Sequence, residues 1–88
     1  MKFEWNEDKN QQNIAKHSID FNDAIQIFMS EVLVFPSPRN EEARSVALGK
    51  YNQRLIAVVF TMRKGVYRII STRIARKKER IRYEQNNS

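Results

Sequence analysis

His17 is the side chain of this sequence best suited to move a proton, because histidine is the residue type that titrates nearest neutral pH and the chain has one histidine. It continues a predicted helical stripe of Lys9, Asn13 and Lys16, in which neighbours are three or four residues apart. A stripe this polar is typical of a solvated helix face, and a cationic residue at a helix C-terminus also interacts with the helix dipole. A catalytic role and a surface role for His17 therefore both stay open.

Glu42 and Arg44 form a second candidate pair. They are two residues apart in a segment, 42–50, whose alternating pattern predicts a strand, so their side chains should point to the same face of a sheet. The pair is suited either to an ion pair or to an acid/base group beside a phosphate clamp.

Three further arginines lie in a predicted β-hairpin made of segments 54–62 and 66–72 around a turn at 63–65. Strict alternation predicts two sets of residues that each share a face: Ala57, Val59, Thr61 and Arg63 on the first strand, and Tyr67, Ile69, Ser71 and Arg73 on the second. Whether Arg63 and Arg73 share a face depends on the register, which remains open. Arg68, within an otherwise apolar strand, is more typical of a sheet edge or rim than of a ligand clamp.

Composition excludes several classes of chemistry. The chain has 88 residues, no Cys and one His, so it has room for one small domain and lacks the residues for disulfides, thiolate zinc sites or multi-histidine metal centres. The net charge of +6 is uneven, because residues 1–62 carry −1 and residues 63–88 carry +7. Clustered Lys and Arg are typical of a surface that binds a polyanion, of a solvated helix face, or of a surface for an acidic protein.

The elements that would position these groups follow from periodicity and capping residues. Helices are predicted at 7–17, after Asp20 through about Phe28, and at 74–83. Strands are predicted at 32–35, 42–50, 54–62 and 66–72, with a short edge strand possible at 3–5 and a reversal marked by Gly49 and 51–53. This order predicts an α+β domain, residues 1–84, in which N-terminal helices pack on one face of an antiparallel sheet of about four strands. The other face would be free to bind, a basic C-terminal helix would follow the sheet, and residues 85–88 would form a polar tail.

No segment of the chain favours a membrane or an exported location. The first residues turn polar and acidic at Glu4, unlike a signal peptide, and the longest apolar run, Leu55–Phe60, has six residues, against the roughly 20 needed to span a bilayer. We expect a cytoplasmic protein.

Ordered motifs over nearly the whole chain resemble one known family. They are Phe3-x-Trp5-Asn6, Lys9, Asn13, Lys16-His17, Phe21-x-x-Ala24, Glu42-x-Arg44, Gly49, Phe60-Thr61-x-Arg63, Arg68-Ile69-Ile70-Ser71-x-Arg73-x-Ala75 and Glu79-Arg80-x-x-Tyr83. In this order and spacing they resemble the BrnT family of type II toxins. The sequence departs from the family pattern at Asn6, where Asp is usual, and at Thr72 and Arg76, where small residues are usual.

The resemblance implies a RelE-like fold, a ribonuclease activity that blocks translation, and neutralisation by a BrnA-type antitoxin. That antitoxin would bind operator DNA through a ribbon-helix-helix part, and the complex would be a heterotetramer. The implied functional residues are Lys9, His17, Arg44, Arg63, Arg68 and Arg73, followed by Glu42, Glu79 and Tyr83.

RNA cleavage without a metal requires a base for the 2′-hydroxyl, cations for the charge that develops on phosphorus, and an acid for the leaving oxygen. We therefore predict catalytic roles for His17, Glu42, Arg44, Arg63 and Arg73, without a metal or another cofactor. Arg63 and Arg73 would be the main cations, with Arg44 or Arg68 assisting, and His17 or Glu42, or alternatively Lys9, would transfer protons. The predicted RNA contacts are Lys9, Lys16, Arg68, Arg76, Lys77 and Arg80. The alternatives are a non-catalytic RNA- or DNA-binding module and a domain that docks an acidic protein.

Overall fold

The protein folds into one mixed β-sheet with helices on both of its faces. The structure is a computed structural model and describes residues 1–86. Along the chain the elements are β1 (Lys2–Glu4), α1 (Glu7–His17), α2 (Phe21–Ala24), the 3₁₀ helix η1 (Ile25–Met29), β2 (Leu33–Pro36), β3 (Ser45–Tyr51), β4 (Arg54–Arg63), β5 (Val66–Ile74) and α3 (Lys77–Asn86). No helix among the described residues is long and apolar enough to cross a membrane.

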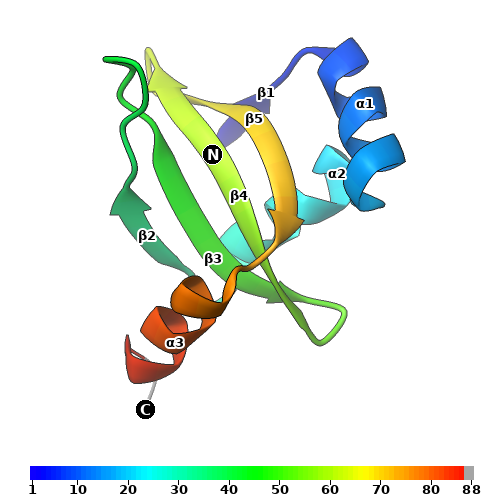
Figure 1. Cartoon of the computed structure of the whole chain (residues 1–88). Helices are drawn as coiled ribbons and strands as arrows, with labels where there is room; N and C mark the ends of the chain where they lie inside the picture. Colours follow the sequence, from blue (N-terminus) through cyan, green and yellow to red (C-terminus); the bar gives the residue numbers. More distant parts are fainter. Residues whose placement is uncertain (87–88) are drawn as a thin grey trace.

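The sheet has the strand order β1-β5-β4-β3-β2 (Figure 1). The four strands from β2 to β5 pair antiparallel, as predicted, and β1 adds a fifth strand parallel to β5. Two-residue turns join β3 to β4 at Asn52-Gln53 and β4 to β5 at Lys64-Gly65, and all four residues have positive φ, as type I′ hairpin turns require. The α+β prediction is confirmed, with a mixed sheet in place of a purely antiparallel one.

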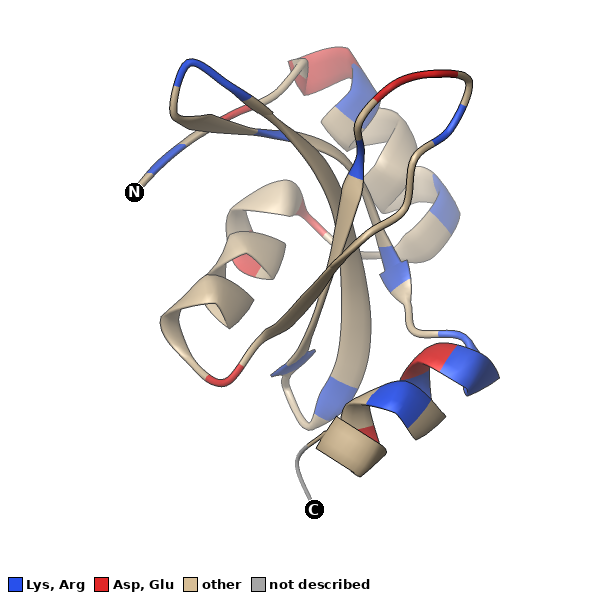
Figure 2. Cartoon of the chain, turned by 90° about the vertical axis from the view of Figure 1, so that its left-hand side faces the viewer, with Lys and Arg blue, Asp and Glu red and all other residues tan. Residues whose placement is uncertain are grey.

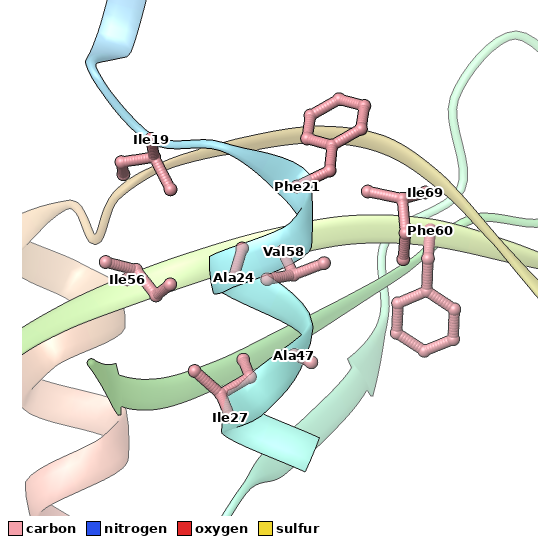
Figure 3. Close-up of a cluster of buried hydrophobic side chains, with 9 residues drawn as sticks. All are labelled: Ile19, Phe21, Ala24, Ile27, Ala47, Ile56, Val58, Phe60 and Ile69. Carbon is pink, nitrogen blue, oxygen red and sulfur yellow. The ribbon is translucent and has the colours of Figure 1, made fainter. Parts of the chain in front are cut away.

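The main core lies between the sheet and the segment α2–η1. Phe21, Ala24 and Ile27 from this segment pack on Ile56 and Val58 of β4 and on neighbouring strand residues (Figure 3). The helix predicted through Phe28 is shorter than expected, because it tightens into η1 after Ala24.

Gly49 explains how η1 can lie so close to the sheet. A Cβ atom at this position would stand 2.7 Å from Ile27 Cβ, a distance that real Cβ atoms do not reach. The glycine lies inside β3 and not at the reversal where the sequence pattern put it. Its role is close packing between a strand and a helix.

The opposite face of the sheet is only partly open. Ala75 and Tyr83 pack there against Val46, Leu48 and Ala57, and α3 lies on the side of the sheet opposite α2 and η1 (Figure 2). The prediction that this face is free is therefore wrong for the end of the sheet that α3 covers. The remaining part of this face carries the groove described below.

The C-terminal helix begins later than predicted. Ile74 is the last residue of β5, and α3 runs from Lys77 through Asn86. Its buried contact is Tyr83, while Ile81 is 45% exposed. Of the predicted polar tail, Gln85 and Asn86 belong to α3, and residues 87–88 lie outside the described range.

A β-bulge in β5 decides which side chains reach the open part of the face. Val59 pairs with Ser71 but Phe60 pairs with Ile69, so Ile70 is an extra residue in β5. The bulge inverts the alternation, which leaves Ile69 in the main core and turns Ser71 to the α3 side. The prediction that Tyr67, Ile69, Ser71 and Arg73 share one face is therefore wrong.

Candidate functional site

An open groove of about 470 Å³ lies on the α3 side of the sheet. Val46, Val59 and Ser71 form part of its lining, together with His17 from α1. The described lining includes five cationic side chains and no acidic one: Lys16, Arg39, Arg44, Arg73 and Arg76. Figure 2 shows basic positions on this side of the molecule in the loop between β2 and β3, at the end of β5 and at the start of α3, together with acidic positions at the tip of that loop and in α3. A groove of this charge attracts polyanions.

His17 reaches the groove because α1 ends there. Ser18 follows in the left-handed conformation and its N–H closes the helix on the Ile14 carbonyl at 2.8 Å. His17 is half-buried. The sequence left open a catalytic role or a position on a solvated helix face, and the second does not describe this side chain. The histidine therefore stands at the groove wall and not on the outer surface of the helix.

Buried asparagines, and not apolar residues, fix α1 to the rest of the fold. Asn10 is fully buried, accepts the Phe21 N–H at 2.9 Å and donates to Asp20 at 3.0 Å. Asn13 exchanges two hydrogen bonds with Thr72 of β5. The expected solvated stripe is thus wrong for Asn13. These bonds hold the helix that carries His17 in one position relative to β5.

Arg73 is held by Glu79 of α3. Its two terminal nitrogens donate to the two carboxylate oxygens at 2.7 and 3.0 Å, and the side chains are 17% and 14% exposed. Glu79 also accepts the Arg76 N–H at 2.8 Å. Burial raises the pKa of Glu79, but the hydrogen bonds from Arg73 and the Arg76 N–H, with the positive charges of both arginines, lower it more, so the pKa lies below its ordinary value. Glu79 thereby positions the groove's two α3-side arginines.

Glu42 and Arg44 lie in the loop before β3, which begins at Ser45, so the strand predicted from residue 42 is wrong there. They still form an ion pair, with Arg44 Nε donating to Glu42 Oε1. The hydrogen bond from Arg44 is the main reason that the pKa of Glu42 lies below its ordinary value. Desolvation, the next largest effect, raises this pKa, and the charges of Arg44, Arg63 and Lys9 lower it further. The Glu42 carboxylate is therefore ionised at neutral pH. It can accept a proton but has none to donate.

Arg63 and Arg73 share a face of the sheet but not a site. Arg73 pairs with Ala57, and Arg63 lies six residues further along β4, which is about 20 Å at the rise of a strand. Of the two, only Arg73 lines the groove, and the catalytic role predicted for Arg63 stays a prediction. Arg63 lies near Glu42 instead, because its charge acts on that carboxylate.

The other predicted RNA contacts are spread over several surfaces. Arg68 donates to Glu4 of β1 at 2.9 Å, and this pair ties β1 to β5. Arg80 donates to the Ala75 carbonyl at 3.3 Å and lines a separate hollow beside Tyr83. Lys77 is exposed at the start of α3, next to Arg76. Arg68 and Arg80 therefore do not line the groove.

A second hollow, of about 250 Å³, adjoins the groove on the α1 side. It shares Lys16, His17 and Ser71 with the groove and adds Lys9 and Gln12 to them. The sequence assigned no role to Ser71, which lines both hollows, or to Arg39. Alternation placed Ser71 on the same face as Arg73 but gave no reason to assign it a role, and Arg39 lies in a loop without periodicity. Among residues 1–86, no three His, Cys, Asp or Glu side chains are grouped as metal ligands would be.

The fold and the groove together define a class: a small α+β domain with a cationic groove that contains a histidine. Residues 5–79 match the family described as the ribonuclease toxin BrnT of a type II toxin-antitoxin system. Since this match spans most of the chain, the protein belongs to the BrnT family, as the motif resemblance indicated. A search of curated proteins found no match.

Proposed function

We propose that this BrnT-family protein is a metal-independent endoribonuclease that acts in the cytoplasm and blocks translation by cleaving RNA in the groove. The observation that supports the proposal is the convergence of His17, Arg44 and Arg73 on one hollow from three separate parts of the chain. The groove combines a group able to transfer protons with cations able to hold a phosphate. Those are the parts that RNA cleavage needs when no metal participates.

The cleavage step assigns a role to each group. A base removes the proton of the 2′-hydroxyl, the 2′-oxygen bonds to phosphorus, and the bond from phosphorus to the 5′-oxygen breaks as that oxygen gains a proton. His17 is placed to transfer a proton, and Glu42, ionised at neutral pH, can act only as a base. Arg44 and Arg73 stabilise the charge that develops on the phosphate oxygens, and Lys16 and Arg76 contact flanking phosphates.

The direct experiment is incubation of purified protein with RNA in EDTA. We expect cleavage products that end in a 2′,3′-cyclic phosphate, at a rate that EDTA does not change. His17→Ala should abolish cleavage, while Gln11→Ala, an exposed change on the same helix, should retain it. Salt-sensitive binding of RNA without strand scission would instead identify a non-catalytic binding module.

The partner is proposed from the family. A toxin of a type II system is paired with an antitoxin, and we propose a BrnA-type ribbon-helix-helix protein that forms a heterotetramer with two toxin chains and binds operator DNA itself. Co-expression with the adjacent reading frame should yield a complex whose mass in light scattering equals two chains of each protein. Expression of the toxin alone should stop incorporation of labelled amino acids, and His17→Ala should restore it.

A further inference from the structure

The second hollow differs from the groove in the chemistry of its lining. Where the groove is ringed by arginines, the hollow has an apolar side chain, Ile70, and an uncharged amide, Gln12, between two lysines. Its volume of about 250 Å³ is slightly below the ~300 Å³ at which pockets for drug-sized ligands begin. Those dimensions suit one flat ring system.

Ile70 is available to the hollow only because of the β-bulge. It is the extra residue between the pairs Val59–Ser71 and Phe60–Ile69, so it is released from strict alternation and lines the hollow beside α1. It is half-buried and therefore presents an apolar surface at the wall of a polar site. A nucleobase lying against such a surface removes apolar area from water.

Gln12 is the amide free to recognise that base. Its side-chain amide makes no hydrogen bond with any other described residue, and the residue is exposed. The neighbouring amide of Asn13 is fully used, because its nitrogen donates to Ile19 and Thr72 and its oxygen accepts the Thr72 N–H. Gln12 therefore offers the only uncommitted donor–acceptor pair of an amide among the described residues of this hollow.

The position of the hollow relates it to the cleavage site. His17 and Ser71 line both hollows, so an RNA strand that passes from the groove into the hollow crosses His17. Lys9, Gln12 and Lys16 are spaced by three and four residues on α1, which places them along one side of the helix. The two lysines can hold phosphates while the amide between them faces the base.

We propose that the hollow is a nucleobase subsite, in which one base next to the cleaved phosphate lies on Ile70 and is read along its edge by Gln12. Single-stranded RNA is read in this manner, through stacking and hydrogen bonds to base edges. The inference rests on the proposed ribonuclease function. It adds that Gln12 is a specificity-determining residue.

Mapping of cleavage sites in an RNA library of random sequence tests this role. Wild-type protein should prefer one base at a position next to the cut, and Gln12→Ala should reduce that preference by about tenfold, the discrimination that a paired amide–base contact provides. Gln11→Ala is the matched control, since Gln11 is adjacent in sequence and donates to Glu7 on another side of α1. An unchanged preference in Gln12→Ala, or an equal loss in Gln11→Ala, overturns the subsite.

A binding measurement separates the subsite from the catalytic proposal. Dinucleotides with a 2′-O-methyl group cannot be cleaved, and their binding should shift the NMR signals of the Ile70 methyl groups and the Gln12 side-chain amide. Such shifts without any RNA cleavage by the wild type would retain the subsite and reject the ribonuclease function. Cleavage of RNA without those shifts would retain the function and reject the subsite.

Discussion

Asn13 and Thr72 are 59 positions apart in the sequence and exchange two hydrogen bonds, in which Asn13 Nδ2 donates to Thr72 Oγ1 at 2.7 Å and the Thr72 N–H donates to Asn13 Oδ1 at 3.1 Å. The parallel strand β1 pairs only with residues Val66 to Arg68 of β5. Beyond them the outer edge of β5 has no strand partner among residues 1–86, and the Asn13 side chain satisfies the Thr72 N–H in place of one. The same contact fixes α1 four residues before His17.

Removal of the Asn13 amide should therefore destabilise the protein. Asn13→Ala leaves the Thr72 N–H and the Ile19 carbonyl without their partner, and we expect a loss of about 3 kcal/mol in the free energy of unfolding, measured with urea. Thr72→Val removes one hydroxyl and should cost about 1 kcal/mol. Gln11→Ala, on the exposed side of the helix, should stay within ~0.5 kcal/mol. Equal losses of unfolding free energy in Asn13→Ala and Gln11→Ala would show that the Asn13 amide does not hold α1 against β5.

The ion pair of Arg73 with Glu79 predicts a pH dependence of stability. The pKa of Glu79 lies below its ordinary value of 4.5 in the folded protein, so its contribution is present above pH 4.5 and disappears as the pH falls through the lower folded-state value. Glu79→Gln should therefore reduce the free energy of unfolding by about 1 kcal/mol at pH 7. The gap to wild type should close in acid, because protonated Glu79 is neutral like glutamine.

Urea titrations of the wild type and Glu79→Gln from pH 7 to pH 3 measure this convergence. Glu84→Gln, an exposed change in the same helix, serves as the control and should follow the wild type at every pH. If the curves for Glu79→Gln and wild type stay parallel down to pH 3, the ion pair contributes nothing to folding.

The distance between Arg63 and Arg73 predicts unequal roles for the cations that sequence reasoning grouped together. Arg44 lines the groove, and Arg44→Ala should lower the rate of RNA cleavage by about 100-fold or more, the cost of removing one group that stabilises transition-state charge. Arg63 lies outside the groove, and Arg63→Ala should lower the rate less than about fivefold through the general field alone. Comparable losses in single-turnover assays of the two variants would show that the groove is not where cleavage occurs.

Replacement of Gly49 by alanine should lower the stability of the protein. Alanine at this position brings its Cβ to 2.7 Å from Ile27 Cβ, and η1 must move away from β3, which should cost about 1–3 kcal/mol in thermal or urea unfolding. Gly65 offers a contrast, because nothing lies within 4 Å of an added Cβ and its φ is +79°. Gly65→Asn should cost less, since asparagine tolerates this conformation. A Gly49→Ala variant as stable as the wild type would mean that η1 is not tightly packed.

Local sequence patterns were sufficient for most of the secondary structure. The cap at Asp20, the alternation in β3 and β4, and the turn at Lys64-Gly65 act over a few neighbouring residues, and the structure has each of them. The ordered motifs were also sufficient for the family, since residues 5–79 match BrnT. Charge pattern indicated a polyanion site in the basic segment 63–88, but only Arg73 and Arg76 of the five groove cations come from that segment.

The remaining features depend on contacts between distant segments. A single extra residue at Ile70 reverses which side chains of β5 face the groove, and a one-residue shift has that effect because side chains alternate along a strand. Asn10 and Asn13 are buried because they form hydrogen bonds with residues outside α1. The sequence does not show these partners, and for this reason the polarity of Asn13 wrongly predicted a solvated position.

The sequence by itself thus determined the helices, the strands, the basic charge and the family, because each of these is recorded in short-range spacing or composition. Only the tertiary structure decided that His17, Arg44 and Arg73 meet at one groove and that Arg63 does not. The physical reason is that contacts between two segments of the chain set the strand register, the bulge and the docking of α1 and α3. No spacing within one segment specifies them.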